Sequence, residues 1–321
     1  MPMNGVDETK AEGSRNSFPR APSWVRLFAT LMPRLPLGKY RSIHFLTRHP
    51  PPPFIWRMAS GAGASSFICD LRDTIAREVC FAGVYERVET AIVQTLLRPG
   101  MVFMDLGADW GYFTLLAASL IGSSGRVISL EPDPRSYALL TTNIELNHLP
   151  NVFAFQLAAA DRDCALALCG YDERGENFGL SSIVARGTEH QFRVGARRVD
   201  DICRECHLPT VDLIKIDVEG AEDLVLAGMA AGLGQHTYRL VLLEIHPSLL
   251  GQRGVEVNNV LEPLLANGYC GWSIDHSADA ARRAAYSSSL NISDYLHPIT
   301  DHLAASEWPH VIFVAPNQGL L

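Results

Sequence analysis

The chain has 321 residues, of which 47% are hydrophobic and 19% charged, and its formal net charge is -8 at pH 7. This composition excludes a largely disordered chain, and the negative balance disfavours binding to the phosphates of nucleic acid. Seven cysteines, an odd number, are typical of a reducing compartment and not of a disulfide framework. No apolar run approaches the roughly 18 residues of a membrane span. We therefore expect a cytoplasmic protein without a membrane span.

The N-terminal part differs in pattern from the rest of the chain. Residues 1–22 mix charge, proline, glycine and serine, which predicts a disordered tail. Apolar residues with interspersed arginine and lysine predict two short helices within 24–46, and a short strand is expected near 67–69. We interpret 23–82 as a helical and strand extension that packs on the main domain. Docking of its helices to a membrane surface or a partner is the alternative.

Beyond residue 82, strand-like and helix-like stretches alternate, which predicts a mostly parallel α/β sheet with helices on both faces. Seven strands are expected at 101–106, 126–130, 152–156, 211–217, 240–246, 269–274 and 310–315, with the first helices at 86–97, 111–121 and 134–147. Short alternating segments predict an inserted ribbon at 165–168, 182–185 and 192–196. We therefore assign 83–321 to one domain, in which 275–309 forms an insertion that covers the substrate.

The loop after the first strand indicates a ligand site. It runs from Asp105 to Gly111 and reads Asp-Leu-Gly-Ala-Asp-Trp-Gly, in which the glycines permit a tight turn and a close approach of the backbone. Glu131 ends the second strand, where an acidic residue accepts hydrogen bonds from both hydroxyls of a ribose. Together the loop and Glu131 indicate a ligand that contains adenosine.

The charge of the loop distinguishes between adenosine ligands. A dinucleotide fingerprint requires a glycine two residues after Gly107 to admit a pyrophosphate, but Asp109 stands there and would repel it. S-adenosylmethionine (SAM) carries an ammonium and a sulfonium instead, and both suit the carboxylates of Asp105 and Asp109. We therefore predict SAM as the cofactor. Another nucleotide, or a purely structural turn, is the alternative.

Longer motifs resemble the FkbM-type methyltransferases of the class I SAM-dependent superfamily. The resemblance covers about 80–316 and rests on DLGADWGYFT from Asp105, EPDP from Glu131, NIELN from Asn143, KIDVEGAE from Lys215 and LEIH from Leu243. It implies a Rossmann-like, seven-stranded sheet with helices on both faces. It also implies O-methylation of a hydroxyl on a small-molecule natural product or a saccharide. The alternatives are an amine or metal-bound catechol as acceptor, and a non-catalytic SAM-binding module.

The resemblance also implies positions for the cofactor. These positions are Asp105, Gly107, Ala108, Asp109, Gly111, Phe113, Glu131 and Pro132, together with Asp161 after the third strand as a contact of the adenine amino group. An Asx turn is the alternative for Asp161. The family usually has asparagine where this chain has Asp109, which keeps acceptor oxygens but lacks the amide donor.

Methyl transfer to an alcohol requires alignment of donor and acceptor and loss of the hydroxyl proton. We expect Asp217, at the end of the fourth strand, to position donor or acceptor. His246, at the end of the fifth, is the expected general base because imidazole titrates near pH ~6.5. A histidine that only holds a loop is the alternative for His246. Further candidates on the acceptor side are Tyr85, Glu86, Glu219 and Glu244. A packed tyrosine with a helix-capping glutamate is the favoured alternative for Tyr85 and Glu86, and favourable charge at a helix N-terminus is the alternative for Glu219.

No motif indicates a metal centre. Cys203, Cys206 and His207 match a haem-attachment pattern, but they stand in an expected connecting helix, and no second ligand pair completes a zinc site. Asp217 and Glu219 alone are insufficient for Mg²⁺. We therefore expect no metal ligands, and we leave the acceptor and the oligomeric state open.

Overall fold

The computed structural model describes residues 18–35, 38–59, 64–170, 181–183, 190–287, 289–299 and 309–320. Parts of several predicted features fall outside these residues: 1–17 of the tail, 36–37 and 60–63 of the extension, 184–185 of the ribbon, and 288 and 300–308 of the insertion. Among the described helices, none is both long enough and apolar enough to cross a membrane.

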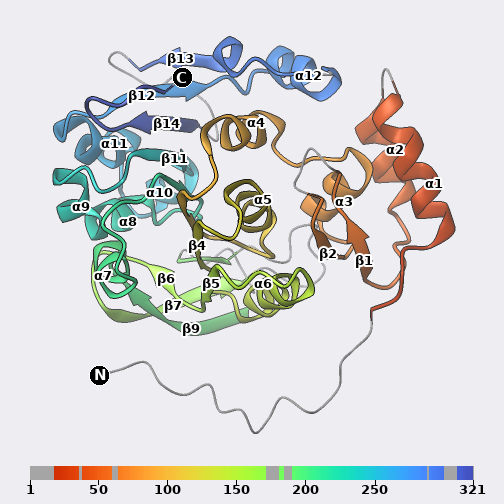
Figure 1. Cartoon of the computed structure of the whole chain (residues 1–321), viewed down its shortest axis with the longest axis horizontal. Helices are drawn as coiled ribbons and strands as arrows, with labels where there is room; N and C mark the ends of the chain where they lie inside the picture. Colours follow the sequence, from red (N-terminus) through yellow and green to blue (C-terminus); the bar gives the residue numbers. More distant parts are fainter. Residues whose placement is uncertain are drawn as a thin grey trace, which may run out of the picture.

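An eight-stranded sheet forms the centre of the molecule (Figure 1), in the order β13-β12-β14-β11-β10-β3-β4-β5. The strands are β3 (Val102–Leu106), β4 (Arg126–Leu130), β5 (Val152–Phe155), β10 (Leu213–Ile216), β11 (Leu240–Glu244), β12 (Cys270–Ile274), β13 (Leu296–Pro298) and β14 (His310–Val314). Strands β3, β4, β5, β10 and β11 are parallel, whereas β14 is antiparallel to both of its neighbours. All seven predicted strands are present, and the three-residue edge strand β13 adds an eighth.

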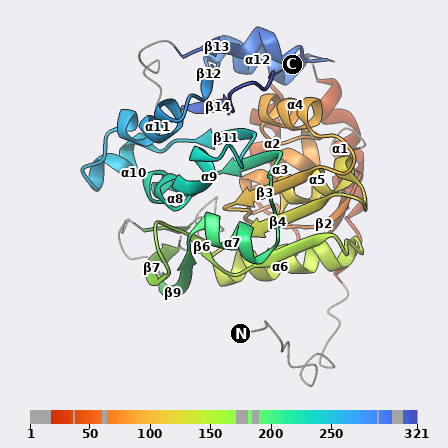
Figure 2. The same ribbon diagram turned by 60° about the vertical axis from the view of Figure 1, so that its left-hand side comes forward.

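Alternate residues of the central strands face two apolar layers. Leu213 and Leu242 pack in the layer that contains α4 and α5, whereas Ile214 and Val241 pack in the layer of α7, α8 and α11. This alternation is the period of two that places successive side chains on opposite faces. Figure 2 shows helices on both sides of the sheet. Their bounds are α4 (Arg87–Leu96), α5 (Tyr112–Ile121), α6 (Pro134–Leu146), α7 (Val199–Glu205), α8 (Glu222–Gly228), α9 (Ala230–Gly234), α10 (Pro247–Gln252), α11 (Val257–Ala266) and α12 (Ala278–Tyr286).

The N-terminal extension shares its apolar core with the α4 and α5 side of the sheet. Its Val25, Phe54 and Phe67 pack in one cluster with Leu115 of α5. The two predicted helices are α1 and α2, and the predicted strand is β2, which pairs antiparallel with β1. Helix α3 was not predicted. The elements are α1 (Ser23–Leu31), the 3₁₀ turn Met32–Arg34, α2 (Lys39–Leu46), β1 (Phe54–Arg57), β2 (Ser66–Cys69) and α3 (Thr74–Phe81).

One buried asparagine connects this extension to the glycine loop. Oδ1 of Asn143, in α6, accepts a hydrogen bond from the backbone N–H of Ile68 at 2.8 Å. Its Nδ2 donates to the carbonyl of Trp110 at 2.8 Å. Since a buried amide must satisfy both ends, Asn143 holds β2 and the loop at a fixed separation.

A second, four-stranded sheet follows β5 in the order β6-β9-β7-β8. Within the described residues it accounts for the predicted ribbon, because β7 and β9 pair antiparallel over seven residue pairs. Its strands are β6 (Ala158–Ala159), β7 (Cys164–Gly170), β8 (Ser181–Ser182) and β9 (His190–Arg197). The sheet contributes Leu166, Leu168 and Ser181 to the wall of the cavity described next.

Candidate active site

A cavity of about 740 Å³ lies beyond the carboxyl ends of β3, β4, β10 and β11. This is the edge at which open α/β sheets bind ligands. All but three of the predicted site residues line it: Tyr85, Asp105, Gly107, Ala108, Asp109, Phe113, Glu131, Pro132, Asp217, Glu219, Glu244 and His246.

The three exceptions are Gly111, Asp161 and Glu86. Gly111 has a φ of +98° and precedes α5, and an added Cβ would lie 2.6 Å from Cδ1 of Leu140. Asp161 is half-buried and lies 3.5 Å from Nη1 of Arg162, away from the cavity lining. Glu86 lies behind the lining, and one carboxylate oxygen comes within 4.8 Å of ligand atoms of Glu244 and His310.

The glycine loop packs directly on the chain after β10. Gly107 has a φ of +81°, and an added Cβ would lie 1.7 Å from the carbonyl oxygen of Asp217. The backbone N–H groups of Gly107 and Ala108 both donate to the carbonyl of Leu130, at 2.9 and 3.0 Å. Position 107 therefore requires glycine for its conformation and for its contact.

Glu131 closes the loop from the side of β4. Its Oε2 accepts the N–H of Asp109 and its Oε1 accepts the N–H of Asp133, each at 2.8 Å. Burial raises the pKa of Glu131 well above its ordinary value, and the charge of Asp109 raises it further. A carboxylate has about four lone-pair sites, so two more donors can still be accepted.

Asp109 occupies a backbone conformation that explains the residue type. Its φ is +47°, in the left-handed region that aspartate and asparagine tolerate better than most side chains. Burial raises the pKa of its carboxyl to about 6, and the charges of Asp217 and Asp133 act in the same direction, whereas a hydrogen bond with Ser136 opposes them.

Lys215 is buried at the base of the cavity. Its Nζ donates to Oδ2 of Asp217 at 2.8 Å and lies 4.8 Å from the ring centroid of Phe113. Burial alone would lower the pKa of Lys215, but the carboxylates of Asp217, Glu86 and other neighbours outweigh it and raise the pKa. The lysine is thus a permanent cation that orients Asp217.

His246 lies just beyond β11, which ends two residues earlier than predicted, and it precedes α10. Its Nδ1 lies 2.7 Å from Oε1 of Glu222, an oxygen that also accepts the N–H of Gly220 at 3.0 Å. Its Nε2 faces three carboxylates, at 3.6 Å from Glu219, 3.6 Å from Glu244 and 3.9 Å from Asp217.

These neighbours make His246 more basic than an ordinary histidine. Burial would lower its pKa, but the hydrogen bond to Glu222 and the surrounding carboxylates raise it to about 9. Glu222, the first residue of α8, therefore orients the imidazole. If Nδ1–H donates to Glu222, the lone pair of Nε2 faces the cavity.

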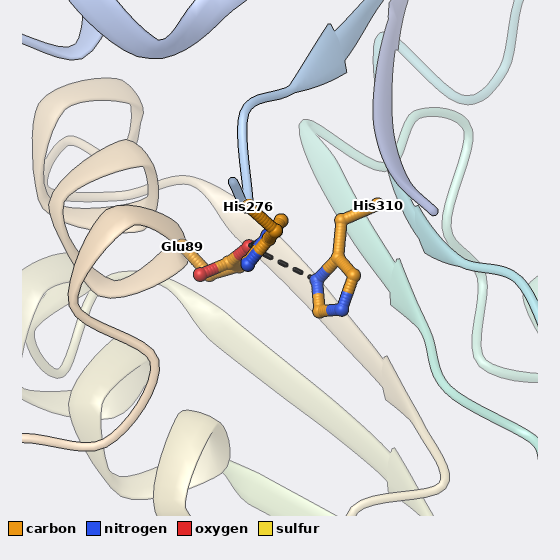
Figure 3. A group of neighbouring side chains, drawn as sticks. All are labelled: Glu89, His276 and His310. Carbon is orange, nitrogen blue, oxygen red and sulfur yellow. Dashed lines mark hydrogen bonds and ion pairs between the residues drawn. The ribbon is translucent and has the colours of Figure 1, made fainter. Parts of the chain in front are cut away.

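Sequence reasoning missed a cluster at the same end of the cavity (Figure 3). Oε1 of Glu89, in α4, lies 2.7 Å from Nε2 of His276 and 2.9 Å from Nδ1 of His310. The other ring nitrogen of His310, Nε2, lies 3.4 Å from Oε1 of Glu244. The two histidines line the cavity. Only the pairing of β14 with β11, which sets His310 opposite Glu244, would have indicated part of this cluster.

The family model of the methyltransferase FkbM domain matches residues 100–270, which is more than half of the chain. The chain belongs to this family. Membership confirms the predicted class I, Rossmann-like fold and SAM as the cofactor.

Individual relatives of this FkbM methyltransferase match shorter stretches. The 2-O-methyltransferase NoeI of Sinorhizobium fredii is 29% identical over 155 residues, which cover 44% of this chain and 63% of NoeI. Methyltransferase 1 of Beauveria bassiana is 29% identical over 143 residues, which cover 39% and 57%. The chain thus spans less than two thirds of both relatives. Among solved structures, fibrillarin of Aeropyrum pernix with natively bound SAM has a TM-score of 0.38 at 15% identity, over 70% of this chain and 72% of fibrillarin.

The lining of the FkbM-domain cavity fits the charge of SAM. Among the described lining residues, Lys215 is the one lysine, and there is no arginine. The carboxyl side chains there are Asp73, Asp105, Asp109, Glu131, Asp217, Glu219 and Glu244. This excess of acidic groups suits a ligand with a sulfonium and an ammonium and would repel a pyrophosphate.

The cysteine motif lies outside this cavity. Cys203 is buried in α7, and its thiol lies 3.8 Å from the hydroxyl of Tyr238. Burial raises the pKa of this thiol to about 12, which disfavours the thiolate that a metal requires. His207 is exposed.

Proposed function

We propose that this FkbM-family chain transfers a methyl group from SAM to a hydroxyl group of a small-molecule natural product or a saccharide. One observation carries the proposal: a buried His246–Glu222 pair faces the same cavity as the glycine loop. A site that only bound SAM would have no need of an oriented base beside it.

The cofactor half of the cavity follows from the residues around the loop. We assign the ribose hydroxyls to Glu131, which lines the cavity and can accept two more hydrogen bonds, and the adenine to the apolar surface of Leu130, Pro132 and Leu157. Asp105 would attract the ammonium group. Asp161 has no part in this assignment, because its carboxylate pairs with Arg162. SAM supplies a methyl group on a positively charged sulfur.

The acceptor half contains the groups that would accept the hydroxyl proton and position the acceptor. We assign the general base to Nε2 of His246, because the bond from Nδ1 to Glu222 holds the ring in one orientation. Asp217, held by Lys215 at 2.8 Å, would position the acceptor hydroxyl or the donor. Tyr85, Glu219 and Glu244 complete the wall of this half.

An acceptor screen tests the function. The purified chain is incubated with methyl-labelled SAM and pools of saccharides and hydroxylated natural products, and the products are identified by mass spectrometry. We expect label in a methyl ether that fragmentation locates on oxygen. His246→Ala is the matched variant, and it should bind SAM but leave the pools nearly unlabelled. Label on nitrogen would contradict the assignment to hydroxyl groups. SAM binding without transfer to any pool would favour a non-catalytic module.

A further inference from the structure

We propose that Glu89, His276 and His310 form a binding site for one divalent transition-metal ion in the acceptor half of the cavity. The three residues come from α4, from the chain between β12 and α12, and from the first position of β14. Figure 3 shows their side chains converging from these separate elements. No sequence motif joins them, so neither the FkbM motifs nor the function proposed above requires this arrangement.

The distances match those of a coordination sphere. One ligand atom from each residue lies within 4.8 Å of the other two. Oε1 of Glu89 lies 2.7 Å from His276 and 2.9 Å from His310. Adjacent ligands on an ion at about 2.1 Å and at right angles lie about 3.0 Å apart, so small shifts would admit the ion. Two imidazoles and one carboxylate on one face suit a transition metal better than Mg²⁺ or Ca²⁺.

The second ring nitrogen of His310 supports the same conclusion. A metal-bound histidine usually donates its other N–H to a carboxylate, which orients the ring. While Nδ1 of His310 faces Glu89, its Nε2 lies 3.4 Å from Oε1 of Glu244. Glu244 is the direct partner of His310 in the pairing of β11 with β14, so the backbone holds this contact in place.

Charge provides a further argument. The centroids of His276 and His310 are 4.1 Å apart, with planes tilted by 40°. Glu89 lies between the two rings, and Glu244 lies beside His310. Two carboxylates beside two imidazoles form a site whose negative charge one bound cation would balance. Glu89 is 1% exposed, so its charge has little water to stabilise it.

The position of the site identifies a class of acceptor, and this step rests on the proposed function. Three protein ligands leave coordination positions open, as in catalytic metal sites. Because His276 and His310 line the cavity, these positions face the acceptor. An acceptor with two adjacent oxygen atoms, such as a vicinal diol, can fill two of them. When bound, the ion would lower the pKa of a coordinated hydroxyl. Oε1 of Glu244 lies 3.4 Å from His310 and 3.6 Å from His246. The ion and the general base His246 would therefore act on the same acceptor in one part of the cavity.

Metal binding tests the site directly. Chelator-treated, tag-free protein is titrated with Zn²⁺, Mn²⁺ and Co²⁺ by calorimetry, and the visible spectrum of the Co²⁺ form is recorded. We expect one ion per chain for at least one metal. His276→Ala, His310→Ala and Glu89→Gln should each weaken binding by about 100-fold or more, since even outer-shell changes cost about 10-fold to 100-fold. The control is His297→Ala, because His297 is 62% exposed and lies outside the cluster, and it should bind like wild type.

Three results would overturn the site. They are the absence of one-to-one binding in wild type, binding that survives all three substitutions, and binding that His246→Ala abolishes while His276→Ala retains it. The last result would place the ion at Asp217, Glu219 and His246 instead. His276→Ala is the key variant, because a side chain that is 33% exposed is removed with little risk to folding.

SAM binding and methyl transfer, measured in parallel, separate this proposal from the function. If the ion binds but SAM does not, the site stands and the function fails. If SAM binds and methyl transfer persists unchanged in chelator, the function stands and the role of the ion in the reaction is wrong. Faster transfer to vicinal diols than to isolated alcohols, lost in His276→Ala, would support the complete proposal.

Discussion

Oε1 of Glu222 and Nδ1 of His246 lie 2.7 Å apart, and neither side chain is more than 2% exposed. Glu222 is the first residue of α8, whereas His246 follows β11 and precedes α10, so the contact joins two loops at the same sheet edge. Because the bond involves Nδ1, the other ring nitrogen is left to face Asp217, Glu219 and Glu244. This orientation carries the assignment of His246 as the base.

Removal of the imidazole should affect the reaction and not the binding of SAM. If His246 accepts the hydroxyl proton, His246→Ala lowers kcat by about 10²-fold to 10⁴-fold, the usual contribution of a general base. The dissociation constant of SAM, measured by calorimetry, should stay within about 3-fold of wild type. His236→Ala is the control, because His236 follows α9, is exposed and does not line the cavity. Near-normal kcat in His246→Ala would eliminate His246 as the base.

The pH dependence of kcat should report the environment of this histidine. A base must be neutral to act, and with a pKa of about 9 only roughly 1% of His246 is neutral at pH 7. The rate should therefore rise from pH 7 toward pH 9 and fall on acidification, with the midpoint lowered when the positive charge of SAM is bound. Glu222→Gln keeps an acceptor for Nδ1–H but removes a charge, so its midpoint should lie at least one pH unit lower. An unchanged midpoint in Glu222→Gln would show that another group limits the rate. The groups that face the ring are Glu222, Glu219, Asp217 and Glu244.

The part of the site that was predicted consists of residues close together in sequence. The glycine loop and Glu131 stand at the ends of two consecutive strands, so their encounter follows from local pattern and from the rule for parallel sheets. The same rule, applied to the ends of the fourth and fifth strands, extended the prediction to Asp217 and His246. The predicted strand 240–246 is two residues too long, because β11 ends at Glu244. Glu244 and His246 have the alternating spacing of a strand, but Pro247 begins α10 and His246 is the residue before that helix.

The metal cluster escaped prediction because it depends on long-range topology. Glu89 and His276 are 187 residues apart, and they meet only because α4 lies beside the chain that follows β12. His310 reaches them because β14 runs antiparallel between β11 and β12, which turns its first residue toward the carboxyl edge of the sheet. For Asp161 the sequence predicted the position but not the partner of the side chain. The residue follows β5 as expected, but its carboxylate pairs with Arg162.

The affinity for SAM should depend on Glu131. Loss of a charged acceptor typically costs about 1.5–3 kcal/mol, so Glu131→Ala should weaken SAM binding by roughly 10-fold to 150-fold in calorimetry. Glu145→Ala is the control, since Glu145 is exposed on α6 and away from the cavity. The variant also loses the acceptor of the N–H groups of Asp109 and Asp133, so its unfolding is measured beside its binding. Unchanged affinity would remove Glu131 from the ribose contact.

Gly107 should not tolerate even one methyl group. An added Cβ would meet the carbonyl of Asp217 at 1.7 Å, and the φ of +81° is itself unfavourable for alanine. We expect Gly107→Ala to lower the free energy of unfolding by about 3 kcal/mol or more and to abolish measurable SAM binding. The control is Gly251→Ala, where an added Cβ meets nothing within 4 Å, and it should change the free energy of unfolding by less than about 1 kcal/mol. Urea denaturation measures the free energy of unfolding of both variants and of wild type. A Gly107→Ala chain as stable as Gly251→Ala would show that the loop can move away from β10.

Asp109→Asn should separate the stability of the chain from its affinity for SAM. Burial and the neighbouring charges of Asp217 and Asp133 raise the pKa of Asp109 to about 6, so the folded protein holds a proton that the unfolded chain loses near pH ~3.8. A carboxyl with a raised pKa costs stability as pH rises through this window, and the full cost is present above it. Asparagine keeps the left-handed backbone and the polar side chain but has no charge to bury.

The variant should therefore be more stable than wild type without SAM, by about 1–3 kcal/mol at pH 7.5, and the difference should shrink toward zero below pH ~4. Its affinity for SAM should fall, by up to about 10-fold, because one carboxylate near the cationic cofactor is lost. Urea denaturation across this pH range and calorimetry provide the two measurements. Asp161→Asn is the control, because Asp161 lies outside the cavity and should leave both quantities unchanged. A less stable Asp109→Asn chain would mean that Asp109 is charged and stabilised in the folded protein, through contacts stronger than its burial.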